Sequence, residues 1–212
     1  MSEILSEINA NMQAGKAKIV KTLVSDALSQ GVAPTDILNK ALLSGMTEIG
    51  EKFKNGDIFV PEVLVAARAM NAGIDLIRPY LVAEGVESKG TAVIGTIKGD
   101  LHDIGKNLVR MMMEGRGINV VDLGSDVEPQ RFFDEAKAHN AQLVCCSALL
   151  TTTMNGMRDV VKLFEDAGMR DKVKIMVGGA PVNQAFCDSI KADCYTPDAA
   201  SAADAALSYL AG

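Results

Sequence analysis

The sequence lacks long apolar runs, an excess of basic residues and paired cysteines. No run reaches the about 18 apolar residues that a membrane-spanning helix requires. The formal net charge of −6 leaves no basic stripe for a phosphate backbone. We therefore expect a cytoplasmic protein with neither a membrane nor a nucleic acid as its partner.

The cysteines do not have the spacing of a zinc site. Cys145 and Cys146 are adjacent within an apolar run, and Cys187 and Cys194 stand far from them. Free cysteine is among the most frequently buried residue types. We expect four buried thiols in a reducing compartment.

The first part of the chain is predicted to be helical. With 48% hydrophobic residues over 212 positions, the chain can form two modest domains. Apolar residues recur at helical spacing up to about residue 83, and Gly15, Gly31 and Gly56 interrupt the pattern. We expect four antiparallel helices, with helix starts at residues 35–36 and 59–61.

The second part of the chain alternates strands with helices. A short polar segment, residues 84–91, separates it from the first, so we predict domains at 1–88 and 89–212. Five β runs are expected, at residues 92–96, 119–123, 143–147, 174–177 and 193–195. This pattern predicts an α/β fold with a flavodoxin-like (Rossmann-type) five-stranded parallel sheet of order 2-1-3-4-5. Ligands of such sheets bind beyond the carboxyl ends of the strands.

The loop after the first strand carries one of the two histidines, His102. Asp100 stands two residues earlier, so in an extended loop its carboxylate can hold one imidazole nitrogen and leave the other free for a metal. Gly99 and Gly105 allow tight turns and the close approach of a bulky group. A loop hydrogen bond, or a helix N-cap by Asp100 or Asp103, explains the same residues without any ligand.

A conventional zinc or iron site is not supported, because no further ligands have suitable spacing. A metal that brings most of its own ligands fits better. The motif formed by Asp100, His102 and Gly105, followed by Ser147-x-Leu149 and then by Gly178-Gly179, resembles the B12-binding fingerprint of corrinoid proteins.

This resemblance implies roles for individual residues. His102 would be the lower axial ligand of cobalt, replacing the cofactor's own dimethylbenzimidazole. Asp100 would hold the imidazole, and Thr153 falls where the family has a hydroxyl, often that of serine, that hydrogen-bonds the aspartate. The remaining implied cofactor contacts are Gly99, Asp103, Ile104 and Gly105 in the loop, Ser147 and Leu149 at the nucleotide tail, Thr151 near the corrin, and Gly178 and Gly179 in the nucleotide slot.

Simpler explanations stand beside these roles. Ser147 and Thr151 could make ordinary strand-end or N-cap hydrogen bonds, and Gly178-Gly179 could form a strand-to-helix turn. The segment around residues 50–63 resembles the cap domain of B12-dependent methyltransfer proteins. In that family an aromatic and an aliphatic side chain cover the upper face of the cobalt, and Phe53 and Val60 match those places. Both could instead pack only the helical core.

The family resemblance implies a methyl carrier that is not catalytic alone. It would accept a methyl group on cobalt(I) of cobalamin or a related corrinoid, with methylcobalamin as its loaded form. The donor would be a methylated or quaternary amine on a substrate:corrinoid methyltransferase, and a second methyltransferase would pass the group to tetrahydrofolate or coenzyme M. A reductive activase is a further expected partner, and the related systems belong to anaerobic microbes.

Three alternatives remain. An adenosylcobalamin mutase subunit shares the histidine motif, but the preceding helices argue against it. A B12 sensor would be expected to carry a DNA-binding or signalling domain. A receiver domain without corrinoid would need an acidic pair near strand one and a lysine near strand five, where the sequence has Tyr195-Thr196-Pro197-Asp198.

Overall fold

The computed structural model describes residues 3–85 and 88–211. Contacts along the chain divide it into two compact units. One comprises Met1–Ser88 with Gly115–Gly117, and the other comprises Lys89–Glu114 with Ile118–Gly212. In the described part of the chain, no helix has the length and apolar character needed to cross a bilayer.

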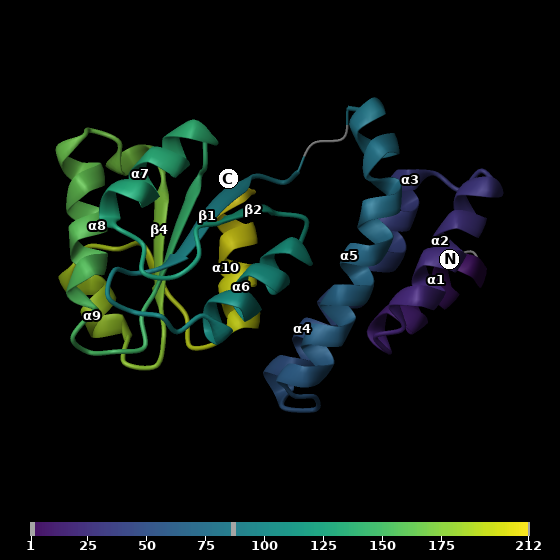
Figure 1. The fold of residues 1–212 in the computed structure, drawn as a ribbon, viewed down its shortest axis with the longest axis horizontal. Helices are drawn as coiled ribbons and strands as arrows, with labels where there is room; N and C mark the ends of the chain where they lie inside the picture. The colour runs from purple at the N-terminus through teal and green to yellow at the C-terminus, as the bar shows by residue number, and fades with distance from the viewer. Residues whose placement is uncertain (1–2, 86–87, 212) are drawn as a thin grey trace. The chain divides into compact units, whose positions relative to one another are not determined.

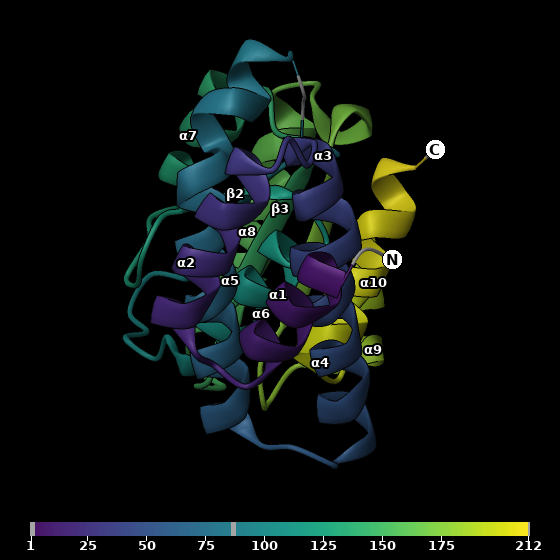
Figure 2. The same ribbon diagram turned by 90° about the vertical axis from the view of Figure 1, so that its right-hand side faces the viewer.

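The first unit is helical, as the spacing of apolar residues predicts. Its elements are α1 (Glu3–Gln13), α2 (Ala17–Ser29), α3 (Pro34–Asp36), the π-helical stretch η1 (Ile37–Leu43), α4 (Ser44–Asn55) and α5 (Val60–Ala83). Because α3, η1 and α4 follow one another without a break, residues 3–85 form four helical segments. Figure 2 shows this unit from the front. Within it, α2 packs along α5, and α1 contacts α2 and α4.

The ends of the helical segments follow local chemistry. Gly56 ends α4 in the left-handed conformation, with φ of 78°, where a residue without a side chain is favoured. The backbone N–H of Phe59 donates to Glu62 Oε2 at 3.1 Å just as α5 begins. The π turn of η1 was not predicted, because the burial of Ile37 and Ala41 fits an ordinary helical spacing as well.

The second unit contains a five-stranded sheet in which every pair of neighbouring strands is parallel. Its order is β2-β1-β3-β4-β5, which confirms the predicted winding. The strands are β1 (Thr91–Thr96), β2 (Asn119–Asp122), β3 (Leu143–Ser147), β4 (Lys174–Gly178) and β5 (Cys194–Tyr195). Thr96 pairs with Ser147, and Ser147 pairs with Gly178, so the last residues of three strands lie side by side at one edge.

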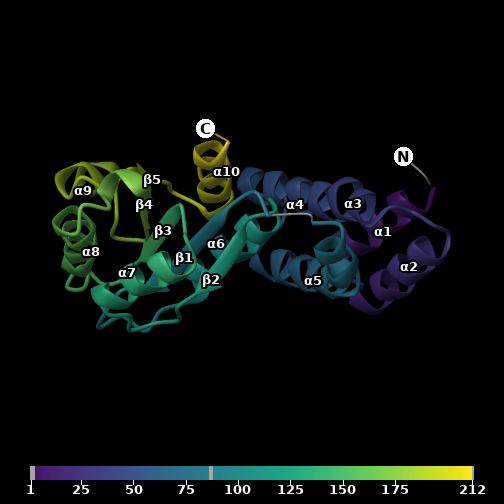
Figure 3. The same ribbon diagram turned by 90° about the horizontal axis from the view of Figure 1, so that it is seen from above.

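Helices cover both faces of this sheet (Figures 1 and 3). One face carries α7 (Pro129–Ala138), α8 (Asn155–Asp166) and α9 (Gln184–Ser189), and the other carries α6 (Ile104–Glu114) and α10 (Ala199–Leu210). A short 3-10 helix, η2 (Arg170–Lys172), precedes β4. Phe132 and Phe164 pack against Val93, Val144 and Ile175 in a fully buried core.

The cysteines are free thiols, and Cys145, Cys146 and Cys187 are buried as expected. Cys194 is half-buried, so the expectation of burial is wrong for this residue. Burial raises the pKa of Cys145 to about 12 and that of Cys187 to about 11. These thiols are therefore protonated and unreactive at neutral pH.

Candidate functional site

The candidate site lies at the carboxyl ends of β1, β3 and β4. The loop between β1 and α6 carries His102, and two buried groups tie it to the sheet. The hydroxyl of Thr96 donates to the carbonyl oxygen of His102 at 2.8 Å, and the N–H of Asp100 donates to the carbonyl oxygen of Ile97 at 3.1 Å. The rigid sheet thus sets the position of the loop.

Asp100 and His102 are joined by two hydrogen bonds. Asp100 Oδ1 lies 2.7 Å from His102 Nδ1 and 3.1 Å from the backbone nitrogen of His102. The side-chain pairing expected from the spacing is present, but it arises from a turn closed by the aspartate side chain and not from an extended loop. The turn fixes both the backbone and the ring of the histidine.

The second carboxylate oxygen of Asp100 is held by the loop after β3. Oδ2 accepts hydrogen bonds from the backbone N–H groups of Leu149 at 2.8 Å and Leu150 at 3.1 Å. The hydroxyl of Thr153 lies 3.0 Å from the same oxygen. Asp100 is fully buried and has five donors, so it does not serve as a helix cap.

These donors keep Asp100 ionised. Burial raises the pKa of its carboxyl group, but the hydrogen bonds from the ring and backbone of His102 and from the Leu149 and Leu150 amides outweigh burial. The net result is a pKa well below the usual range. An ionised carboxylate only accepts hydrogen bonds, so the proton of a neutral His102 is on Nδ1 and the lone pair is on Nε2.

His102 Nε2 is available to a ligand. The side chain is 53% exposed, and Nε2 has no hydrogen-bond partner among the described residues. Within residues 3–85 and 88–211, no three His, Cys, Asp or Glu side chains gather around a potential metal position. The donor set fits a metal that takes one imidazole from the protein and its other ligands from an organic macrocycle.

Exposed apolar side chains occur in the two loops that are joined through Asp100. Leu101 and Ile104 are 74% and 72% exposed, and Leu149 and Leu150 are also exposed. Four exposed aliphatic side chains in these loops favour a large apolar ligand over water. Leu101 and Leu150 were missed at the sequence level. In the sequence, each is recognisable only as an apolar residue beside polar residues or glycine in a loop.

Two hydroxyl groups near the strand ends are unpaired. Ser147 ends β3 and is half-buried, and Thr151 is exposed in the loop that follows. Neither hydroxyl has a hydrogen-bond partner within the part of the chain described by the structure.

The two glycines after β4 differ. A Cβ atom on Gly179 would lie 1.8 Å from the carbonyl oxygen of Ala148, and its φ of 125° suits only glycine, so the fold itself requires this residue. A Cβ atom on Gly178 would meet nothing within 4 Å. Gly178 thus borders open space, as a residue that lines a slot must.

The candidate cap residues lie in the helical unit. Phe53 is in the last turn of α4 and Val60 begins α5, and both are half-buried. Each therefore leaves part of its side chain outside the helical core. Phe59, beside Val60, is 69% exposed and was missed, although an aromatic residue ahead of a helix start is visible in the sequence.

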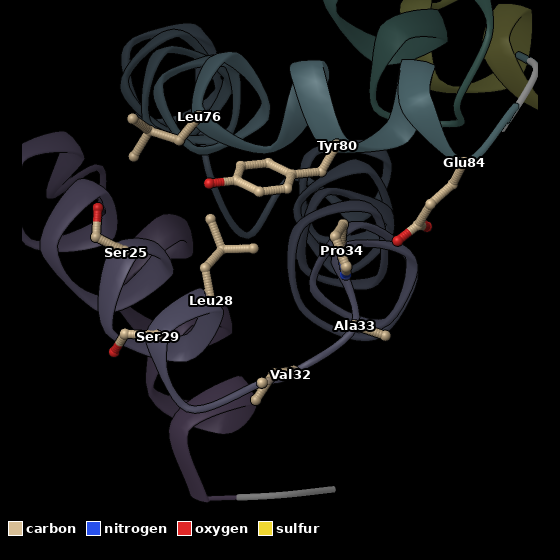
Figure 4. Close-up of a pocket in the computed structure, with 10 residues that line it drawn as sticks. Ser25, Leu28, Ser29, Val32, Ala33, Pro34, Leu76, Tyr80 and Glu84 are labelled. Carbon is tan, nitrogen blue, oxygen red and sulfur yellow. The ribbon is translucent and has the colours of Figure 1, made fainter.

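The helical unit also contains a pocket of about 620 Å³. Ser25 and Leu28 of α2, Pro34 of α3, and Tyr80 and Glu84 are among the residues that line it. Figure 4 shows the Tyr80 ring close to Leu28, with Ser25 and Glu84 toward opposite ends. None of the residues that the sequence predicts as site residues lines this pocket.

Comparison with known proteins identifies the family. A family model described as "B12 binding domain" matches residues 90–207, which is more than half of the chain. This chain belongs to the B12-binding protein family. A second model with the same description matches residues 4–78. The family membership confirms the resemblance drawn from the motifs and indicates cobalamin or a related corrinoid as the cofactor.

Relatives align along nearly the full length of this family member. Dimethylamine corrinoid protein 2 of Methanosarcina acetivorans is 42% identical over 212 residues, covering 99% of this chain and 97% of the relative. Trimethylamine corrinoid protein 1 of Methanosarcina mazei is 44% identical over 180 residues, covering 84% and 83%.

Solved structures of similar proteins share the fold. The methanol:cobalamin methyltransferase complex MtaBC from Methanosarcina barkeri contains a chain that matches with a TM-score of 0.91 and 31% identity, covering 100% of this chain and 81% of that one. A cobalamin-binding protein from Desulfitobacterium hafniense matches with a TM-score of 0.78 and 30% identity, covering 97% and 98%.

Proposed function

We propose that this chain is a corrinoid methyl carrier in which His102 Nε2 is the lower axial ligand of cobalt. One observation carries the proposal: a half-exposed imidazole with a free Nε2 is held through Nδ1 by the buried carboxylate of Asp100. A carboxylate behind a metal-binding imidazole fixes its orientation and raises its basicity. The bound corrinoid would supply a cobalt centre that accepts and yields a methyl group.

Thr153 extends this arrangement. Its hydroxyl oxygen lies 3.0 Å from Asp100 Oδ2 and 2.9 Å from the carbonyl oxygen of Leu150, yet it has only one proton to donate. With Asp100 ionised, the hydroxyl donates to the carboxylate. If Asp100 is protonated, the hydroxyl can turn to Leu150 and accept from the carboxyl group. We infer that His102, Asp100 and Thr153 share one relay proton whose position tunes the ligand.

The other predicted contacts surround the same strand ends. We propose that Ser147, Leu149 and Gly178 contact the nucleotide tail, which suits the unpaired hydroxyl of Ser147 and the open space beside Gly178. Thr151 would lie near the corrin. Gly179 would line the slot through its backbone, and the loop contacts would come from Gly99, Asp103, Ile104 and Gly105.

We further propose that residues 1–88 form the cap domain and residues 89–212 the cobalamin-binding domain. The half-buried Phe53 and Val60, together with the exposed Phe59, would cover the upper face of the corrin. An apolar cover excludes water and competing nucleophiles from a reactive centre. The separate matches at residues 4–78 and 90–207 support this division of roles.

The names of the relatives support a substrate class. Dimethylamine and trimethylamine corrinoid proteins match at 40–44% identity, so we propose a methylated amine as the methyl source. A partner amine methyltransferase would deliver the group, and a second would pass it to tetrahydrofolate or coenzyme M. A reductive activase would restore the carrier after oxidation. We place the protein in the cytoplasm, where its free thiols remain reduced.

Electron paramagnetic resonance tests the ligand. The protein is reconstituted with hydroxocobalamin and reduced to cobalt(II), and the spectrum is compared with that of the His102→Ala variant. Both proteins are also prepared with ¹⁵N-labelled histidine, because dimethylbenzimidazole that binds cobalt in the variant gives nitrogen splitting too. A splitting that changes on ¹⁵N labelling is expected only in the wild-type protein. Its absence there, or failure to bind corrinoid, contradicts the proposal.

A transfer assay tests the carrier role. Reduced holoprotein is incubated with an amine methyltransferase and with dimethylamine, trimethylamine or methanol, and methylation is followed by absorbance. We expect methylation with an amine and none without the methyltransferase. A protein that binds corrinoid through His102 but is methylated by no donor would instead be a sensor.

A further inference from the structure

The loop after β2 holds the backbone of the His102 loop. Its residue Asp126 forms two hydrogen bonds with adjacent residues of that loop. The carboxylate Oδ1 accepts from the N–H of Gly99 at 2.8 Å, and the N–H of Asp126 donates to the carbonyl oxygen of Asp100 at 3.0 Å. Asp126 thus holds the backbone on both sides of the Cα atom that carries the Asp100 side chain: the Gly99 N–H before it and the Asp100 carbonyl after it.

Asp126 adopts an uncommon conformation to make these contacts. Its φ is 56°, in the left-handed region, which aspartate tolerates better than most residues with a side chain. Gly99 also has a positive φ, of 83°. A glycine in this region has many accessible conformations, so an external hydrogen bond is needed to select one.

The surrounding residues fix Asp126 itself. Val127 forms a parallel bridge with Ile97, and the Val127 N–H donates to the Thr96 carbonyl at 2.9 Å. Lys98 Nζ lies 3.6 Å from Asp126 Oδ1 and 3.1 Å from Glu128 Oε1. The Gly99 amide lowers the pKa of the exposed Asp126, slight desolvation opposes this shift, and Lys98 lowers the pKa further.

We propose that Asp126 is a positioning residue for the cobalt ligand: its Oδ1 holds Gly99 and thereby sets the orientation of Asp100 and of the His102 imidazole. This inference rests on the proposed role of His102. Nothing in the B12-binding motif marks Asp126, which lies 24 residues after His102 in the loop that follows β2.

Two substitutions separate the Asp126–Gly99 hydrogen bond from the backbone conformation of residue 126. Asp126→Asn keeps an oxygen acceptor for the Gly99 N–H and tolerates positive φ, whereas Asp126→Gly keeps the backbone conformation and removes the acceptor. Glu128→Gln is the matched control, because it weakens the other ion pair of Lys98 but does not contact Gly99 or Asp100. All three are reconstituted with hydroxocobalamin and reduced to cobalt(II).

We expect Asp126→Gly to bind corrinoid about tenfold or more weakly and to lose part of the imidazole nitrogen splitting, as for other groups that orient a metal ligand. Asp126→Asn and Glu128→Gln should retain the wild-type spectrum. The inference is overturned if Asp126→Gly keeps the full splitting, or if Asp126→Asn loses as much as Asp126→Gly.

Hydrogen exchange in the wild-type protein provides a measurement that does not depend on the folding of a variant. In the wild-type apoprotein, the Gly99 amide should exchange slowly. Unprotected exchange at Gly99 in the wild type would refute the contact. Failure of the proposed function looks different, because the His102→Ala variant and the wild type would then give the same spectrum.

Discussion

Asp100 accepts hydrogen bonds from both the backbone nitrogen and the ring Nδ1 of His102, at 3.1 and 2.7 Å, through a single oxygen. Its other oxygen faces the Leu149 and Leu150 amides. One buried carboxylate therefore links the ends of β1 and β3 and aims the imidazole. The same residue serves folding and ligand geometry, and this dual role can be tested.

Asp100→Asn should destabilise the apoprotein, although the two side chains have the same shape. In either orientation the new NH₂ group faces backbone N–H donors, and leaving a buried donor unpaired costs about 1–3 kcal/mol. Urea unfolding measures the loss. Asp103→Asn on the same loop is the control and should lie close to wild type. Equal stability of the Asp100 and Asp103 variants would show that the five-donor arrangement is wrong.

Thr153 should be replaceable by serine but not by valine. Serine keeps the hydroxyl near Asp100 Oδ2, whereas valine keeps the shape and removes the donor. Thr153→Val should slow methyl transfer about tenfold or more, as for other residues that support a metal ligand. Transfer kinetics of the reconstituted variants measure this effect. If valine and serine behave alike, the hydroxyl has no part in the relay.

The glycine pair after β4 should separate folding from binding. Gly179→Ala places Cβ 1.8 Å from a backbone oxygen, so we expect a loss of more than about 3 kcal/mol or failure to fold. Gly178→Ala meets no atom of the protein and should fold normally. If the nucleotide tail occupies that space, Gly178→Ala will bind cobalamin more weakly. Thermal unfolding and cobalamin titration measure the two effects, and unchanged binding would remove Gly178 from the slot.

The Lys106–Asp122 pair should make the free energy of unfolding of the sheet domain fall as the pH is lowered. Burial raises the pKa of Asp122, but the hydrogen bond from Lys106 Nζ at 2.6 Å, the Gly124 amide and Arg110 lower it below the ordinary value of 3.8. A lowered pKa stabilises the fold above about pH 4, and this contribution is lost as pH falls through the folded-state pKa.

Lys106→Met should therefore flatten the acid side of the stability curve. Denaturant unfolding at several pH values between about 2 and 6 measures the slope. Lys162→Met, an exposed residue of α8, is the control and should keep the wild-type slope. A Lys106→Met curve parallel to wild type would mean that the pair does not hold Asp122 ionised.

The sequence by itself determined the fold class and the pairing of Asp100 with His102. Strand and helix periodicities reflect which face of each element is buried, so they predicted five parallel strands. Their order was predicted from the flavodoxin-like winding that five such strands favour. The Asp100–His102 pair was predictable because both residues lie within one short loop. The helical first part was predictable for the same local reason, apart from the π turn of η1.

Only the tertiary structure showed which distant residues meet that loop. Leu149 and Leu150 donate through backbone amides, which are present at nearly every position and therefore leave no mark in a sequence. Asp126 reaches Gly99 because β2 lies beside β1, a neighbour relation set by sheet order. The sequence does not distinguish Gly178 from Gly179, but in the structure Gly179 has a positive φ and lies against the carbonyl of Ala148. These relationships depend on which residues of different strands come close together. The fold sets those distances, whereas the local pattern of apolar and polar residues reports only on neighbours along the chain.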